Sequence, residues 1–117
     1  MSDITRIETG RRMSQVTIHN QVAYLAGQIP DDGHSDITVQ TQQVLAKIDR
    51  LLAEAGSDRG RLLSAQVFLA DIGDFAGMNQ VWEAWVPEGT APSRATVQAH
   101  LAGPGFKVEI VVLAAVA

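Results

Sequence analysis

A long segment with helical periodicity on one side constrains the fold of this chain more than any other feature. It starts at Ser35 or Asp36, either of which can cap a helix, and ends near Gly56. Apolar residues recur along it at helical spacing, namely Val44, Ile48, Leu51, Leu52 and Ala55. Polar residues fill the opposite side, among them Gln42, Lys47, Asp49, Arg50 and Glu54. A helix with one apolar side is predicted to cover one face of a sheet.

Runs of β-prone residues on both sides of this helix predict the strands of that sheet. Residues 4–7 predict a very short strand, and residues 14–27 predict a hairpin that turns at His19-Asn20-Gln21, because Asn tolerates the left-handed conformation. Three more strands are predicted at residues 62–69, 95–99 and 107–115. The last of these follows a turn at Gly103-Pro104-Gly105.

A second helix is predicted after Asp74. Its apolar stripe is interpreted as core and consists of Phe75, Met78, Trp82 and Trp85. Pro87 and Gly89 are expected to end it.

The predicted order is β-β-β-α-β-α-β-β within a single domain spanning residues 1–117, an α+β fold with two helices on one face of a mixed sheet. A chain of 117 residues with six strands has no second layer of helices for the other face. Burial of that face against other subunits is therefore expected.

Composition and charge exclude several classes of function. The net charge of −4 disfavours nucleic acid as a partner, because phosphate binding requires clustered positive charge. The absence of cysteine excludes disulfides and thiolate metal sites, and it fits a reducing cytoplasm. The N-terminal residues 1–6 lack the pattern of a signal peptide, and no run approaches the roughly 20 apolar residues of a membrane span. A soluble, cytoplasmic protein is expected.

Two charged residues are candidates for chemistry. Glu109 shares one face of its predicted strand with Val111 and Leu113, where a carboxylate is costly if buried alone. It is interpreted either as an acid/base or water-orienting group at a cleft, or as half of an ion pair or an exposed strand end near Lys107. Arg94 opens a strand after a Pro-containing loop, so it is either a rigid carboxylate-binding group or a surface charge.

Other sites find no support in the sequence. His19, His34 and His100 lack the spacing of metal ligands, so no metal site is predicted. The Gly103-Pro104-Gly105 segment lacks the Gly-Lys-Ser/Thr ending of a phosphate loop. No Gly-x-Ser-x-Gly elbow is present, which argues against a hydrolase triad.

Several segments together resemble the Rid/YjgF family of reactive-intermediate deaminases over nearly the whole chain. They are Tyr24-Leu-Ala-Gly-Gln-Ile-Pro30, Leu51-Leu-Ala-Glu-Ala-Gly56, Val67-Phe-Leu-Ala-Asp-Ile-Gly-Asp-Phe75, Asn79, Ala91-Pro-Ser-Arg-Ala-Thr-Val97 and Val108-Glu-Ile110. The resemblance implies a chorismate-mutase-like fold assembled as a homotrimeric barrel, with ligand clefts between neighbouring subunits.

The same resemblance implies cofactor-free hydrolysis of a 2-imino acid, or of its enamine tautomer such as 2-aminoacrylate, to a 2-oxo acid and ammonia. Arg94 would hold the substrate carboxylate, Glu109 would orient water, and the backbone of Gly27 would address the imine. Asn79 matches a family position near the cleft.

The chain departs from the family pattern at three cleft positions. Met13 stands where well-known deaminating members have a tyrosine, Thr96 where they have a cysteine, and Ala26 where they have a serine. These changes leave open a non-catalytic trimer that binds small carboxylates. A ribonuclease label is attached to parts of the family, but the acidic net charge argues against that activity.

Overall fold

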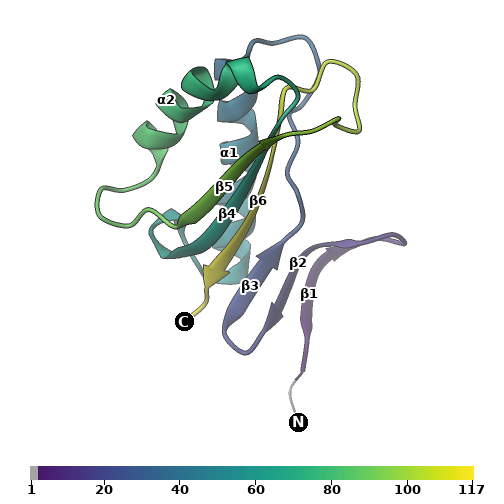
Figure 1. Ribbon diagram of the computed structural model, residues 1–117. Helices are drawn as coiled ribbons and strands as arrows, with labels where there is room; N and C mark the ends of the chain where they lie inside the picture. The colour runs from purple at the N-terminus through teal and green to yellow at the C-terminus, as the bar shows by residue number, and fades with distance from the viewer. Residues whose placement is uncertain (1–2) are drawn as a thin grey trace.

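The computed structural model describes residues 3–117. Met1 and Ser2 lie outside the described residues; they belong to the N-terminal residues 1–6 that lack a signal-peptide pattern. Six strands form one mixed sheet, with α1 behind it and α2 beside α1 on the same side (Figure 1). The strands are β1 (Thr5–Thr9), β2 (Ser14–His19), β3 (Val22–Leu25), β4 (Leu62–Leu69), β5 (Ser93–Gln98) and β6 (Val108–Ala115). Their spatial order is β1-β2-β3-β6-β4-β5, in which only β4 and β5 are parallel neighbours. The predicted order and class of elements are confirmed.

The N-terminal hairpin turns where the sequence predicts. Asn20 and Gln21 both have positive φ, 50° and 66°. Two consecutive left-handed residues match the right-handed twist of the strands in a two-residue turn. His19 then pairs with Val22 across the turn.

Helix α1 (Ile37–Ala55) begins after Asp36, which accepts a hydrogen bond from the Val39 amide at 2.9 Å, so Asp36 rather than Ser35 is the cap. Gly56 ends the helix with a left-handed φ of 81°. The predicted apolar face is buried throughout, and so is Leu45.

Helix α2 (Phe75–Trp85) departs from the prediction at its first residue. Met78, Trp82 and Trp85 are buried as expected, but the Phe75 side chain is 42% exposed. The helix starts at Phe75, directly after a 3₁₀ turn at Ile72–Asp74. The Phe75 ring lies against the guanidinium of Arg94 and not in the core.

Strand β5 begins two residues earlier than the predicted start at Ala95 and ends one residue earlier, at Gln98. Its parallel pairing with β4 runs from Ser64 opposite Ser93 to Leu69 opposite Gln98. The length of β4 therefore sets the length of β5, and Arg94 lies within the strand.

The sheet has one buried and one open face. Along β6, Val108, Ile110, Val112 and Ala114 are fully buried beneath the helices. Glu109, Val111 and Leu113 alternate with them and are half-buried on the other face, which neither α1 nor α2 covers.

The loop before β6 is held by one buried amide. Gln40 is fully buried; its Nε2 donates to the carbonyls of Ser35 and Gly105, each at 3.0 Å, and its Oε1 accepts from the Lys107 amide at 2.7 Å. Because all of these groups are paired, the side chain fixes the backbone two residues before Glu109.

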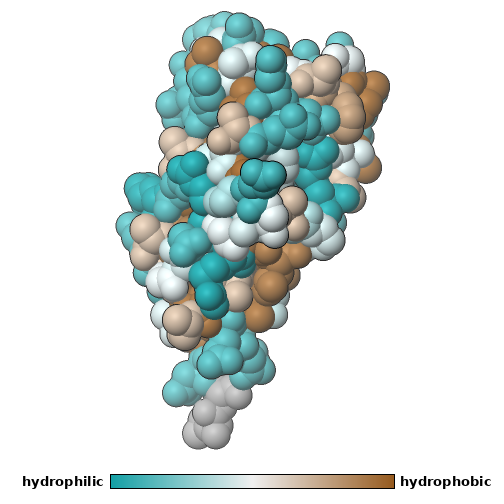
Figure 2. Space-filling model, turned by 90° about the vertical axis from the view of Figure 1, so that its left-hand side faces the viewer, coloured by the Kyte–Doolittle hydropathy of each residue, from teal (hydrophilic) through white to brown (hydrophobic). Residues whose placement is uncertain are grey.

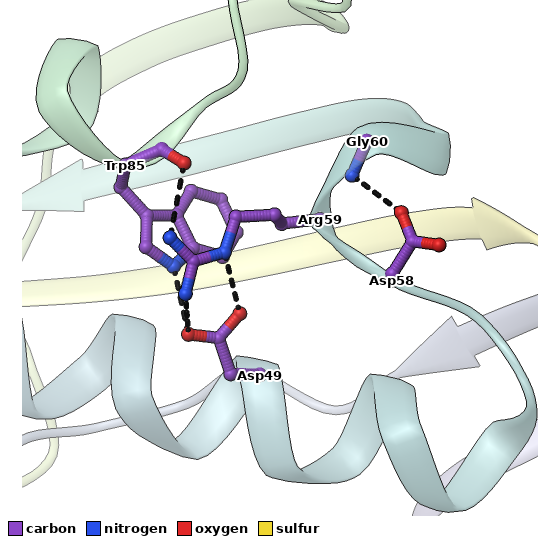
Figure 3. A network of polar contacts seen from close by, with 5 residues as sticks. All are labelled: Asp49, Asp58, Arg59, Gly60 and Trp85. Atoms are coloured by element: carbon purple, nitrogen blue, oxygen red, sulfur yellow. Dashed lines mark hydrogen bonds and ion pairs between the residues drawn. The ribbon is translucent and has the colours of Figure 1, made fainter.

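A second polar network joins the two helices to the 3₁₀ turn at Arg59–Arg61 (Figure 3). Asp49 accepts two hydrogen bonds from Arg59, at 2.6 and 3.1 Å, and one from the Trp85 indole at 3.0 Å. The Arg59 guanidinium also lies over the Trp85 ring, 5.2 Å from its centroid. Asp58 caps the turn through the Gly60 amide.

Candidate active site

Arg94 points from β5 toward α2. It pairs with Ala65, whose side chain is buried beneath the helices, so the two share the helix-covered face of the sheet. Its Nη1 lies 3.9 Å from the Met78 sulfur, and its Cζ lies 5.4 Å from the Trp82 ring centroid and 5.9 Å from that of Phe75. A thioether and two aromatic rings therefore surround the guanidinium.

The charge of Arg94 is not neutralised by a contact. Within residues 3–117, no carboxylate lies within ion-pair distance of it. Burial lowers the pKa of Arg94 below its ordinary value, and the nearby charge of Glu83 partly opposes this effect. A guanidinium still remains protonated at neutral pH. It is thus a half-buried cation with hydrogen-bond donors available to an anion.

Two other predicted residues accompany Arg94. Thr96 lies two residues further along β5 on the same face, and its buried Oγ1 has no hydrogen-bond partner in the part of the chain that the structure describes. Asn79 is half-buried on α2, at helical spacing from Phe75 and Trp82. The structure places Arg94, Thr96 and Asn79 in one region, which we call the arginine half-site.

Gly27 and Glu109 come together elsewhere. Gln28 exchanges two backbone hydrogen bonds with Ile110, at 2.9 and 3.1 Å, and this bridge presses residue 27 against β6. A β-carbon at position 27 would overlap a carboxylate oxygen of Glu109. Only glycine leaves room for the side chain of Glu109 in this position.

Met13 lies beside Gly27. The two line a hollow of about 500 Å³, together with Glu8, Gln15, Gln28, Ile29, Lys47 and Arg50. The Met13 side chain is 48% exposed. Gly27 and Glu109 form the second region, the glutamate half-site, to which we add Met13 because it lines the hollow beside Gly27; Glu109 does not line that hollow.

The two half-sites do not meet within one chain. Glu109 pairs with Phe68 on β4, and Phe68 pairs with Val97 on β5, three residues beyond Arg94. Arg94 and Glu109 are thus separated by two strand spacings across the sheet and by three residues along the strand direction. This separation puts their Cα atoms on the order of 14 Å apart. Their side chains also lie on opposite faces of the sheet, so one chain cannot bring both to one small molecule.

Known proteins are similar to this chain along almost its whole length. A family model described as Endoribonuclease L-PSP matches residues 3–116. A RutC family protein from Haemophilus ducreyi is 49% identical over 113 residues, covering 97% of each chain. The RutC family protein YoaB from Escherichia coli K12 is 48% identical over 113 residues, covering 97% of this chain and 98% of the relative.

Solved structures are also similar to this chain along almost its whole length. A member of the YjgF protein family from Neisseria meningitidis superposes with a TM-score of 0.95 at 44% identity, covering 98% of this chain and 96% of that one. This chain belongs to the Rid/YjgF (RutC) family. YyfA of Yersinia pestis, from the Rid protein family, is more distant at 30% identity and a TM-score of 0.91, covering 97% and 100%.

Membership of the Rid/YjgF family confirms the predicted chorismate-mutase-like fold.

The surface on the α2 side mixes hydrophilic and hydrophobic residues in small patches (Figure 2). No helix among residues 3–117 is long and apolar enough to cross a membrane. In the same range, no cluster of three or more His, Asp or Glu side chains is arranged to hold a metal ion.

Sequence reasoning assigned no site role to Met78, Phe75 and Trp82, which surround the guanidinium of this Rid/YjgF chain. Their helical spacing was the available signal, but it is the same signal that a core stripe gives. Which strand such a stripe faces cannot be read from periodicity.

Proposed function

We propose that this Rid/YjgF protein hydrolyses 2-imino acids, or their enamine tautomers, to 2-oxo acids and ammonia. The observation that carries the proposal is the unneutralised guanidinium of Arg94, held between Met78, Trp82 and Phe75. A guanidinium fork binds a carboxylate through two parallel hydrogen bonds. Every 2-imino acid offers such a carboxylate next to its reactive carbon.

The glutamate half-site would carry out the second half of the reaction, the addition of water to the imine. Glu109 would accept a proton from water as the water oxygen bonds to the imine carbon, while the imine nitrogen gains a proton. The hydroxyl proton of the resulting carbinolamine passes to its amino nitrogen as the carbon–nitrogen bond breaks, which releases ammonia and leaves the 2-oxo acid. An enamine substrate first takes a proton on carbon and loses one from nitrogen to become the imine. No cofactor takes part in these steps.

The separation of the two half-sites supports a cleft between subunits. A neighbouring copy that packs on the open face would bring its own residues to the ligand, and a closed trimer repeats this contact three times. Arg94, Thr96 and Asn79 of one subunit would then face Gly27, Glu109 and Met13 of the next. In this arrangement Thr96 offers its unused hydroxyl to the bound acid.

A stopped-flow measurement tests the proposal. Imino acids generated immediately before mixing are followed by ammonia release, with wild type beside Arg94→Ala and Arg94→Lys. We expect Arg94→Ala to lose about 100-fold or more in kcat/KM, because the carboxylate anchor is gone. Arg94→Lys keeps the charge without the fork and should lose less.

Arg61→Ala is the matched control. The side chain of this exposed arginine donates to the Ala115 carbonyl at 3.2 Å, and its replacement should leave the rate unchanged. Wild-type rates equal to buffer with every imino acid would refute the proposal.

A binding protein without catalysis is the second candidate. The replacement of three cleft groups by Met13, Ala26 and Thr96 favours it, since polar groups near the imine are fewer. Saturable binding of 2-oxo acids that requires Arg94, without acceleration of hydrolysis, would identify this function. Ribonuclease activity has no comparable support, because the chain carries a net charge of −4.

A further inference from the structure

Phe75 is the exposed member of the group around Arg94. Trp82 and Met78 lie beneath the guanidinium with 6% and 0% of their surface exposed, whereas Phe75 keeps 42%. All three contact Arg94, and anchoring of the guanidinium accounts for the two buried residues but not for an aromatic ring left in solvent. An exposed ring beside a ligand-binding cation is suited to contact with the ligand.

A carboxylate held by Arg94 brings the side chain of the acid within reach of this ring. Two parallel hydrogen bonds of about 2.8 Å hold a carboxylate carbon roughly 4 Å from the guanidinium Cζ. The substituent on the next carbon then lies about as far from Cζ as the Phe75 centroid does, 5.9 Å, so a substituent that turns toward α2 reaches the ring. An apolar substituent there would cover part of the exposed ring and leave water.

The other half-site also presents an exposed apolar side chain. Met13 is an exposed, flexible thioether that lines the same hollow as Gly27. Thioethers adapt to apolar groups of varied shape. Met13 therefore adds an apolar contact to a hollow whose other lining side chains are mostly polar or charged.

We infer that Phe75 determines specificity for 2-imino acids with extended apolar side chains, of the leucine or phenylalanine type, over short ones such as the alanine-derived imine. This inference rests on the proposed function, because it assumes that Arg94 holds the substrate carboxylate. Phe75 supplies a wall for the substrate side chain and takes no part in proton transfer.

The test compares two imines on four proteins: wild type, Phe75→Ala, Phe75→Leu and Ile72→Ala. We expect Phe75→Ala to lower the ratio of kcat/KM for the leucine-derived imine over the alanine-derived imine by about 10-fold, the discrimination that a small apolar contact provides. Phe75→Leu keeps an apolar wall and should retain most of the ratio. Ile72 is exposed to 48% in the turn before α2, and Ile72→Ala controls for loss of apolar surface near the helix start.

A binding arm separates this inference from the proposed function. Calorimetric titration with 4-methyl-2-oxopentanoate and pyruvate measures side-chain preference without any chemical step. A preference for the longer acid that Phe75→Ala removes supports the inference even if no imine is hydrolysed. Equal losses for both acids, or no loss for either, would overturn it, and so would binding of neither acid by the wild-type protein. Thermal unfolding of each variant identifies losses that come from misfolding.

Discussion

At the scale of the residue, Arg94 differs from the basic residues of the helix layer in what it contacts. Lys47, Arg50 and Arg59 each pair with a carboxylate, those of Asp31, Glu8 and Asp49. Arg94 instead contacts a sulfur and two rings, which fix its position and leave its charge for another molecule. The proposed role of Arg94 in binding a carboxylate rests on this difference in partners.

Gly27 gives a prediction at the same scale. In Gly27→Ala, the new methyl group would take the space of the Glu109 carboxylate and force that side chain to move. The far end of a flexible side chain moves at little cost, so stability should change by less than about 1 kcal/mol. Activity should fall by about 10- to 100-fold, because displacement of a catalytic group by an ångström is enough for such a loss.

Parallel measurements of imine hydrolysis and thermal unfolding check this expectation. Gly10→Ala is the control, since a β-carbon there would meet nothing nearer than the Met13 carbonyl oxygen at 3.8 Å. Full activity of Gly27→Ala would mean that the contact between positions 27 and 109 has no role in turnover.

At the scale of the element, the sequence predicts the helices, their ends and the hairpin turn, because apolar periodicity and capping residues determine them. Asp36 and Gly56 delimit α1, and Asn20 marks the hairpin turn, because these depend on local conformation. The direction in which Arg94 points depends on the parallel register of β5 with β4, which is a long-range pairing with no local signal. For the same reason, no pattern revealed that Arg94 and Glu109 occupy opposite faces, or that Phe75 leaves the core stripe.

The contact of α1 with α2 gives a prediction about stability. Asp49→Ala removes the carboxylate that accepts from both Arg59 and Trp85, so the indole N–H loses its partner and the guanidinium is left with its hydrogen bond to the Trp85 carbonyl (Figure 3). We expect the free energy of unfolding to fall by about 2 kcal/mol, since hydrogen bonds to charged groups contribute about 1.5–3 kcal/mol. Denaturant unfolding measures the change.

Asp3→Ala, at an exposed aspartate before β1, is the matched control and should be neutral. If Asp49→Ala were as stable as wild type, solvent screening would outweigh the network, because both charged side chains are about one-third exposed or more.

At the scale of the whole molecule, the proposed trimer makes a prediction that no single subunit can satisfy. Arg94→Ala and Glu109→Gln should each be inactive alone. If the cleft joins Arg94 of one subunit to Glu109 of the next, a mixed trimer contains clefts in which both residues are intact. Random exchange of equal amounts should restore activity in about one quarter of the clefts, because each cleft draws its two sides independently in a cyclic assembly.

Subunit exchange is achieved by mixing the two variants in denaturant and refolding them together, with light scattering to confirm a mass of three 12.5 kDa chains. The same variants refolded separately and then mixed provide the control, and they should stay inactive for as long as subunits do not exchange. Recovery to about one quarter would establish that Arg94 and Glu109 act across an interface. A properly assembled mixture without recovered activity would contradict a shared cleft. Since the two side chains lie on opposite faces of one sheet, the proposed deaminase would then have to work without one of them.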